Sequence, residues 1–404
     1  MAAAAPRPAT APTPSIDWSK LGFGDRPVHG QVVVTHKDGK WGEPEWSTSP
    51  YLHIHSASAA LNYGQQCFEG IKAFRTKSGS VHIFRPHANA HRINLSAQTA
   101  SMPTIPLPLF LDALRKAVAG NLDYVPPYGP NASGGALYIR PLLLATGPSL
   151  ILDPPKEFTF VVWVTPVGSL YGTGGNLPAI DAFVLDTFDR SAPMGTGHTK
   201  LGGNYAPVFG PTAAAKKRGF PITLHLDSAE HTYIDEFSTS NAIGISTSTG
   251  ATRLIVPESP SILRSVTKLS VVDIASKHLG WAVERRPVKF SELAEGSFAE
   301  FFAAGTAAGV TPVRSVSYNT KKPVRKELAQ GEAADAAEQA LPIWEEAPGN
   351  EIKKIELGDG QTAGPLSRQM WVELTSFQCG DREDIFGWLW PKEGIVAEDA
   401  ITAK

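Results

Sequence analysis

Short apolar runs of strand length recur along the first half of the chain. Residues 31–36 (QVVVTH), 37–40 (KDGK) and 41–46 (WGEPEW) read as strand, turn and strand, which predicts a β-hairpin. Residues 158–164 (FTFVVWV) form a continuous apolar run with the length of a buried strand rather than of a membrane helix. Further strands are predicted at 81–84, 136–145, 158–165, 181–187, 222–226, 281–288 and 298–303.

Helical periodicity is clearest in residues 108–120, where Pro108 and Gly120 mark the two ends. One face of this predicted helix carries Phe110, Leu111, Leu114, Ala117 and Val118. Other helices are predicted after Pro86 and at 205–218, 261–278, 364–377 and, as a solvated Ala/Glu-rich helix, 326–340. Strands and helices alternate without a regular βαβ period, so the predicted fold class is mixed α/β (α+β).

The length of 404 residues allows two or three domains. Residues 166–178 (PVGSLYGTGGNLP) contain four glycines and two prolines, a composition suited to a connector. The predicted order is therefore a disordered tail (1–16), an N-terminal α/β domain (17–166), a connector (167–178) and a C-terminal domain (179–404).

Charge and cysteine content exclude several classes of protein. The 37 Lys and Arg residues against 39 Asp and Glu give a net charge of −2, so we expect no nucleic-acid or membrane partner. Only Cys67 and Cys379 are present, which excludes a disulfide framework and a four-thiolate zinc site. His53 and His55 lack a nearby third ligand, so no metal site is expected. The expected location is the cytoplasm, with the mitochondrion left open.

The most distinctive local segment is residues 195–205 (GTGHTKLGGNY). It differs from a phosphate-binding Walker loop because Thr199 and Leu201 flank the lysine. Glycines let the backbone enclose Lys200, and partial desolvation would favour a neutral amine that forms Schiff bases. From these residues alone, a solvated loop lysine is the alternative.

Two further segments could contact a ligand. Residues 233–241 (YIDEFSTSN) place carboxylates beside hydroxyls and an amide, which could face a cofactor or cap a turn. Residues 260–268 (PSILRSVTK) lead into an amphipathic helix, whose first amides could bind an anion or only water.

Taken together, these segments resemble the branched-chain amino-acid aminotransferases, which are fold-type-IV pyridoxal-phosphate enzymes. The resemblance is closer to the eukaryotic branch and implies a two-domain architecture with the active site at the domain interface. The matching blocks, in the order of the family, are 23–24 (FG), 37–44 (KDGKWGEP), 61–75 (LNYGQQCFEGIKAFR), 84–94 (FRPHANAHRIN), 137–143 (LYIRPLL), 200–205 (KLGGNY), 236–241 (EFSTSN) and 304–310 (AGTAAGV).

The resemblance implies a role for each residue that would hold pyridoxal 5′-phosphate. Lys200 corresponds to the lysine that bonds the cofactor and moves the Cα proton, and Glu236 to the acid on the pyridine nitrogen. Tyr205 falls where the family contacts the phenolic oxygen, and Arg92 where it binds phosphate. The remaining implied cofactor contacts are Val266, Thr267 and Thr306.

The resemblance also implies a substrate pocket with apolar walls and polar groups for the carboxylate. The implied activity is reversible transamination of leucine, isoleucine and valine with 2-oxoglutarate, which gives the 2-oxo acids and L-glutamate, in a homodimer whose site is completed across the interface. The implied substrate contacts are Phe23, Tyr63, Phe68, Tyr138, Arg140, Thr239 and Ala307.

Several positions depart from the family pattern. Ser240 stands where many relatives have methionine and Ser238 where they have glycine, while the redox Cys-x-x-Cys of mammalian relatives falls at Ala308 and Thr311. Arg264-Ser265 replaces a usual Pro-Gly, and Lys268 a usual arginine. One alternative is therefore a specialised pathway that aminates an unusual aliphatic or aromatic 2-oxo acid. Others are a D-amino-acid or amine transaminase, an aminodeoxychorismate lyase, or a catalytically silent interaction protein.

Overall fold

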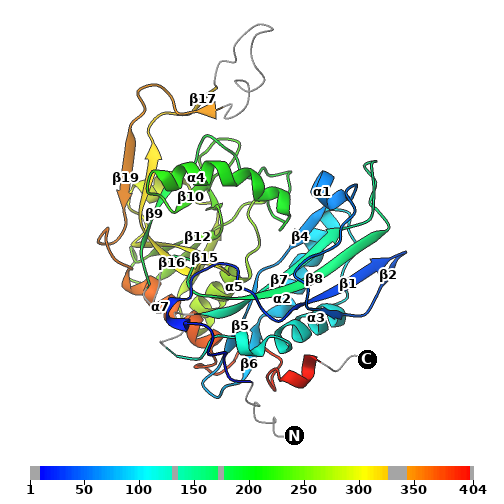
Figure 1. Cartoon of the computed structure of the whole chain (residues 1–404). Coiled ribbons are helices and arrows are strands. Elements are labelled where there is room, and N and C mark those ends of the chain that lie inside the picture. The colour runs from blue at the N-terminus through cyan, green and yellow to red at the C-terminus, as the bar shows by residue number, and fades with distance from the viewer. Residues whose placement is uncertain (1–9, 130–134, 172–176, 326–343, 401–404) are drawn as a thin grey trace, which may run out of the picture.

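The computed structural model describes residues 10–129, 135–171, 177–325 and 344–400, and their strands form two large sheets (Figure 1). All strand pairs of the first sheet are antiparallel. The second sheet contains both parallel and antiparallel pairs. Together with the helices, these sheets confirm the mixed α/β fold class.

The first sheet has the order β2-β1-β8-β7-β5-β6-β20, with β3 beside β1 and β4 beside β7. Its central strands confirm the two long strands that the sequence predicts around residues 140 and 160. The strands are β1 (Gln31–Lys37), β2 (Lys40–Trp41), β3 (Glu45–Ser47), β4 (Gln66–Phe68), β5 (Ile71–Arg75), β6 (Val81–Phe84), β7 (Ala136–Ala145), β8 (Glu157–Val167) and β20 (Leu389–Trp390).

Three helices accompany this sheet: α1 (Ala59–Tyr63), α2 (Pro86–Thr99) and α3 (Leu107–Ala119). The apolar face of α3 is buried as the sequence predicts, and Phe110 stacks on Phe160 of β8 with ring centroids 5.8 Å apart. Asp38 and Gly39 adopt positive φ angles between β1 and β2, as a two-residue hairpin turn requires. The predicted hairpin is therefore present.

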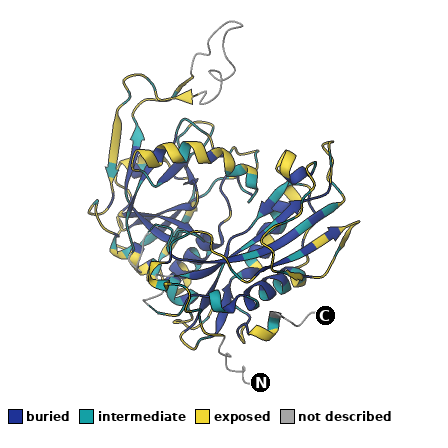
Figure 2. Cartoon of the chain, in the orientation of Figure 1, coloured by how far each residue is buried: buried dark blue, intermediate teal, exposed yellow. Residues whose placement is uncertain are grey.

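The second sheet has the order β11-β10-β9-β16-β15-β12-β13-β14, with β19 beside β16. Most of its strands are buried and appear dark blue in Figure 2. No residue of β14 or β19 is buried, and β19 appears yellow, as does much of helix α4 (Phe209–Lys217) on the outside. The strands are β9 (Ile180–Val184), β10 (Ile222–Leu226), β11 (Ile234–Phe237), β12 (Asn241–Ser246), β13 (Arg253–Pro257), β14 (Ala282–Arg286), β15 (Glu300–Gly305), β16 (Gly309–Asn319) and β19 (Ile352–Glu356).

The remaining α-helices are α4 (Phe209–Lys217), α5 (Val266–Asp273), α6 (Phe290–Ala294) and α7 (Pro365–Gln378), and β17 (Val324–Arg325) and β18 (Trp344–Glu345) form a small ribbon. A π-helical turn (Ile274–His278) continues α5, and short 3-10 turns complete the described elements. In the described part of the chain, no helix is long and apolar enough to cross a membrane.

Two predicted helices begin later than the sequence pattern indicates. The helix predicted from residue 205 starts at Phe209, after two short 3-10 turns, which puts Pro211 in its first turn, where a proline is tolerated, rather than in its interior. The helix predicted from residue 261 starts at Val266, where the Ser265 side chain accepts a hydrogen bond from the Lys268 amide. The helix predicted at 326–340 lies outside the described residues.

The two ends of the described chain contact the first sheet and its surroundings. The Thr13 amide donates to the carbonyl of Asp123 at 2.7 Å, so the expected disorder of 1–16 does not extend to this residue. Near the other end, β20 pairs with β6, which brings Leu389 opposite Phe84. The chain therefore leaves the first sheet after β8, builds the second, and returns to the first. The division into domains at 167–178 stays a prediction.

Glu300, a buried carboxylate at the start of β15, caps helix α7. Its two oxygens accept hydrogen bonds from the amides of Leu366 and Ser367, at 2.9 and 2.7 Å, and from the Ser367 hydroxyl. The first amides of a helix have no partner within the helix, so the carboxylate satisfies them and stabilises the positive end of the helix dipole. Gly364 lies so close to this carboxylate that a Cβ there would clash with it.

We expect Glu300→Ala to lower the free energy of unfolding by about 1–3 kcal/mol, because two buried amides lose their acceptor. Urea unfolding followed by circular dichroism measures this change. The matched control is Glu295→Ala, at an exposed position near the end of α6. Equal stability of the two variants would contradict a capping role for Glu300.

Candidate active site

A cavity lies between the two sheets and is lined by residues from both parts of the chain. From the first part come Arg92 on α2 and Tyr138 on β7, and from the second come Glu236 on β11 and the loop around Lys200. The structure thus brings together residues that are far apart in sequence. The predicted site residues on its wall are Arg92, Tyr138, Lys200, Tyr205, Glu236, Thr239, Thr306 and Ala307.

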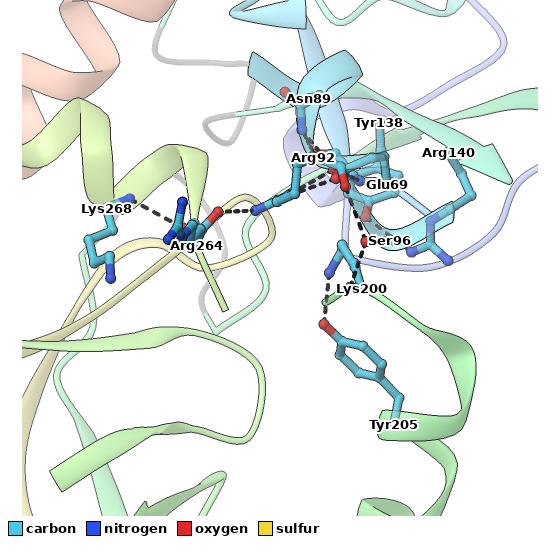
Figure 3. Close-up of polar contacts among 12 residues, drawn as sticks. Glu69, Asn89, Arg92, Ser96, Tyr138, Arg140, Lys200, Tyr205, Arg264 and Lys268 are labelled. Atoms are coloured by element: carbon cyan, nitrogen blue, oxygen red, sulfur yellow. Dashed lines mark hydrogen bonds and ion pairs between the residues drawn. The ribbon is translucent and has the colours of Figure 1, made fainter. Parts of the chain in front are cut away.

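Lys200 lies in the loop between β9 and the 3-10 turn at 202–204, and its backbone is bonded to the first half of the chain. Its amide donates to Ser96 Oγ at 2.9 Å, and its carbonyl accepts from the Phe68 amide at 3.1 Å. The side chain points toward Tyr205, whose Oη lies 2.9 Å from Nζ (Figure 3). Nζ also lies 4.5 Å from the centroid of the Phe68 ring. The amine is thus fixed by a phenol and an aromatic face.

Two of the glycines around Lys200, Gly197 and Gly202, are needed because the loop packs closely against other side chains there, whereas a Cβ at Gly203 would meet no other atom within 4 Å. A Cβ at Gly197 would clash with Ser191, and one at Gly202 would press against Gln66 at 2.8 Å. This fits the sequence-based interpretation that small residues allow close approach here.

Glu236 is fully enclosed and accepts three hydrogen bonds. Oε1 accepts from Arg190 Nη1 at 2.7 Å and from the Leu263 amide at 3.1 Å, and Oε2 accepts from Asn241 Nδ2 at 2.9 Å. A carboxylate offers about four acceptor positions, so about one remains on Oε2 for a further donor. Burial raises the pKa of Glu236, and the Arg190 guanidinium acts in the opposite direction.

Arg190 and Asn241 both contact Glu236. The sequence assigned no role to Arg190 and indicated for Asn241 only that its amide could face a cofactor or cap a turn. Both are buried, and Arg190 forms an ion pair with Glu236. The only other sequence signal was their nearness to matched segments, since Arg190 precedes the glycine loop and Asn241 ends the EFSTSN block.

Arg92 faces the same cavity and is held by a second buried acid, Glu69. Nε and Nη2 of Arg92 donate to the two Glu69 oxygens at 2.6 Å each, and Nη1 donates to the Arg264 carbonyl at 3.0 Å (Figure 3). Asn89 Nδ2 also donates to Glu69, at 2.7 Å. Burial opposes the charge of Arg92, but the Glu69 carboxylate raises its pKa above the usual range. Three of five guanidinium N–H groups are used, so about two remain for an anion.

The start of helix α5 lies beside Arg92. The Arg264 carbonyl, which accepts a hydrogen bond from Arg92, is only two residues before Val266, the first residue of the helix. Val266 and Thr267 are its first two residues, so their amides lack acceptors within the helix. Val266, Thr267 and Lys268 lie just behind the cavity wall, which Ser265 lines. Lys268 is also buried, and burial lowers its pKa. A helix start and an arginine thus converge on one place, as an anion site requires.

The substrate-side residues of the first sheet form an aromatic enclosure around Arg140. Arg140 Nη2 donates to Tyr138 Oη at 3.0 Å, and its Cζ lies 4.7 Å from the Phe68 ring centroid and 5.7 Å from that of Trp163. Phe23 meets the Tyr138 ring edge to face, with centroids 5.5 Å apart. Phe23, Phe68, Tyr138 and Arg140 are therefore one cluster, to which the structure adds Trp163.

Two turns of the second sheet form the opposite wall. Thr306 and Ala307 lie in the hairpin turn between β15 and β16, and Thr239 lies in the turn between β11 and β12. Ser238 and Ser240 line the same wall, and Ser238 Oγ has no hydrogen-bond partner within the described residues. The hydroxyl groups of Ser238 and Ser240 therefore make this wall of the cavity polar.

Tyr63 does not line this cavity. It is 48% exposed, and its Oη donates to the Leu150 carbonyl at 2.8 Å, away from the other site residues. Its substrate role stays a prediction. Groups of three or more potential metal ligands are absent from the part of the chain that the structure describes.

Comparison with known proteins gives a family. The family model described as Amino-transferase class IV matches residues 66–316, more than half of the chain. This range contains all the residues that line the cavity, from Gly70 to Ala307.

Named relatives extend the match. The chain is 47% identical over 304 residues to "Transaminase AMT5" of Alternaria alternata, covering 75% of this chain and 80% of that one. It is 44% identical to "Branched-chain amino acid aminotransferase gloG" of Glarea lozoyensis, covering 76% and 84%. It is 38% identical to the branched-chain-amino-acid aminotransferase of Haemophilus influenzae, covering 93% and 98%.

Solved structures show the same fold. The branched-chain aminotransferase of Escherichia coli superposes with a TM-score of 0.66 at 24% identity, over 88% of this chain and 98% of that one. On the family match and these relatives, the chain belongs to the class-IV aminotransferases, the fold-type-IV pyridoxal-phosphate enzymes that include the branched-chain aminotransferases.

Proposed function

We propose that this chain transfers the amino group of leucine, isoleucine or valine reversibly to 2-oxoglutarate, giving the 2-oxo acids and L-glutamate. The observation that carries the proposal is Arg140 within an aromatic enclosure next to Lys200. Aromatic rings can contact an aliphatic side chain, and a guanidinium among them can pair with the distal carboxylate of the alternate substrate. One pocket can thus accept both partners of the exchange.

The residues present fit pyridoxal phosphate. When bound, this cofactor supplies an aldehyde carbon that bonds amines and a ring that withdraws electrons. Glu236 retains about one acceptor position for the pyridine N–H, and Arg92 retains about two donors for phosphate. The amides of Val266 and Thr267 would complete the phosphate site.

Lys200 is the group placed to move a proton. Its Nζ lies 2.9 Å from Tyr205 Oη, and this hydrogen bond orients the amine within the cavity. A neutral amine so held can take the proton from the substrate Cα and return it to a neighbouring atom. Thr239 and the turn at Thr306 and Ala307 would hold the α-carboxylate on the opposite wall.

The side-chain pocket supports a class of substrate rather than one amino acid. Apolar contacts distinguish aliphatic side chains that differ by one methylene by only about 1–3 kcal/mol. Leucine, isoleucine and valine are therefore all expected donors.

A second candidate is transamination of an unusual aliphatic or aromatic 2-oxo acid in a specialised pathway. The polar wall formed by Ser238 and Ser240 supports it, because an unpartnered buried hydroxyl can bind a polar group that leucine lacks. Several fungal relatives also carry names that state a transaminase without a branched-chain substrate.

A homodimer is part of the proposal. Leu150, Ile151 and Leu152 are 81%, 65% and 89% exposed, and the exposed Tyr63 lies beside them through its bond to Leu150. Apolar side chains gathered on a surface are typical of an interface between protein chains. In such a dimer, this surface would contribute Tyr63 to the partner's pocket.

A panel of amino donors tests the proposed substrate class. Leu, Ile, Val, Phe, Met, D-Ala and an aryl amine are each assayed with 2-oxoglutarate, and glutamate formation is measured. We expect the three branched-chain donors to be used best. A preference for phenylalanine would favour the second candidate, and a preference for D-alanine or the aryl amine would contradict both.

Lys200→Ala should abolish turnover and the visible absorbance of the bound cofactor, because no other residue described in the cavity offers an amine. Steady-state assay and absorption spectra measure the two effects. Lys216→Ala, at an exposed position on α4, is the control and should keep both. Full activity in Lys200→Ala would rule out the assigned chemistry.

Arg140→Met should raise the KM for 2-oxoglutarate by about tenfold or more, because a charge-assisted hydrogen bond to the distal carboxylate is lost. The KM for leucine should change much less, since an apolar side chain makes no such bond. Arg285→Met, which removes an exposed ion pair with Glu258, is the control. Equal changes in the KM for 2-oxoglutarate and for leucine would show that Arg140 does not bind the distal carboxylate.

A further inference from the structure

A second, larger cavity lies beside the active site. Its volume is about 420 Å³, and it extends between the first sheet and helix α7. Because Lys72 on β5 is its most distinctive residue, we call it the Lys72 cavity. Besides Lys72, its wall includes Phe74, Tyr128, Trp371, Leu374 and Asp381.

The two cavities follow one face of the first sheet. Lys72 of β5 is directly opposite Tyr138 of β7 in an antiparallel pair, so their side chains project to the same face. Tyr138 lines the active site, and Lys72 lines the neighbouring cavity. The hairpin turn between β15 and β16 separates them, and Ala307 in this turn lines both cavities.

The ammonium group of Lys72 forms no ion pair or hydrogen bond with the residues that the structure describes, and none of their charges offsets the effect of burial on its pKa. The carboxylate of Asp381, in the same cavity, is instead occupied by the Tyr128 hydroxyl at 2.6 Å. Burial lowers the pKa of Lys72 to about 8, which still leaves the amine largely charged at neutral pH. A buried ammonium group without an ion-pair partner is stabilised when an anion binds beside it.

The rest of the wall is suited to an apolar group. Phe74, Val310 and Leu374 are buried residues of one hydrophobic core cluster, and the partly buried Trp371 packs against this cluster. A ligand that fits both parts of the cavity would carry one negative charge and an apolar tail. A strongly hydrated inorganic anion would leave the apolar wall uncovered.

We propose that the Lys72 cavity binds a small organic carboxylate, whose anionic end pairs with Lys72 and whose tail lies against Trp371 and Leu374. The bound carboxylate contacts the back of the turn at Ala307, whose front faces the substrate. Occupancy therefore changes the affinity of the active site for its amino acid, and this coupling rests on the proposed function. By linkage, the amino acid changes the affinity for the carboxylate by the same factor.

The turn between β15 and β16 is short and is held at both ends, so contact with one side of it affects the other side. Thr306, Ala307 and Ala308 connect the paired residues Gly305 and Gly309, and Gly309 has a φ of +64°. The Thr311 hydroxyl donates to the Ala308 carbonyl at 2.8 Å, which ties the turn to β16 on the side of the Lys72 cavity. A ligand that moves Ala308 thus moves Ala307 with it, because the turn is short and fixed at both ends.

Binding is tested first, by calorimetry on the full-length holoenzyme with 4-phenylbutanoate as the probe. We expect one site per chain, with affinity reduced about tenfold or more in Lys72→Gln, where the charge-assisted bond is lost. Lys72→Arg, which keeps the charge, should retain binding. Lys77→Gln, in the exposed turn after β5, is the matched control and should bind as the unaltered chain does.

Kinetics then test the coupling. With leucine varied at fixed 2-oxoglutarate, 4-phenylbutanoate should change the KM for leucine in the unaltered chain and in Lys77→Gln, but not in Lys72→Gln. Binding that is unchanged in Lys72→Gln would overturn the proposal. So would strictly competitive inhibition that persists in Lys72→Gln, because the probe would then occupy only the active site. Calorimetry needs no turnover, so a failure of the proposed function leaves the binding result readable.

Discussion

The Lys200 segment is held to the first sheet by its own backbone, and the active site depends on this attachment. The Lys200 amide and carbonyl are bonded to Ser96 and Phe68, and the next residue, Leu201, forms an isolated β-bridge with Cys67. A residue that follows β9 of the second sheet is thus fixed against β4 and α2. Because main-chain hydrogen bonds leave little freedom, the amine reaches a position between the two sheets that neither sheet could define alone.

Two buried ion pairs, Arg92–Glu69 and Arg190–Glu236, give this interface its charge pattern. In each pair the charges are matched, and each partner makes additional hydrogen bonds, which offsets the cost of burying them. The first pair presents donors toward the helix start at Val266, and the second presents an acceptor. The phosphate of the cofactor would therefore meet hydrogen-bond donors, and its pyridine N–H would meet an acceptor. Both sets of groups are already held in place by their ion pairs.

The sequence predicted the elements whose patterns are local. The strands around residues 140 and 160 and the helix at Leu107–Ala119 follow directly from apolar runs and periodicity. Helix starts were less accurate, because the Leu263 amide is used by Glu236 rather than by a helix. Arg190 and Glu69 were not identified as site residues, since their importance comes from a partner 46 or 23 residues away. Trp163 lies in an apolar strand and gave no sign that it would face an arginine.

Because β20 pairs with β6, the first sheet stays incomplete until late in synthesis of the chain. Leu389 and Trp390 close one edge of a sheet whose other strands all lie before residue 168. During synthesis, β6 therefore keeps an unpaired edge until residues 389–390 have left the ribosome. An open edge strand can pair with other chains, so the nascent protein can associate through β6 until β20 covers it.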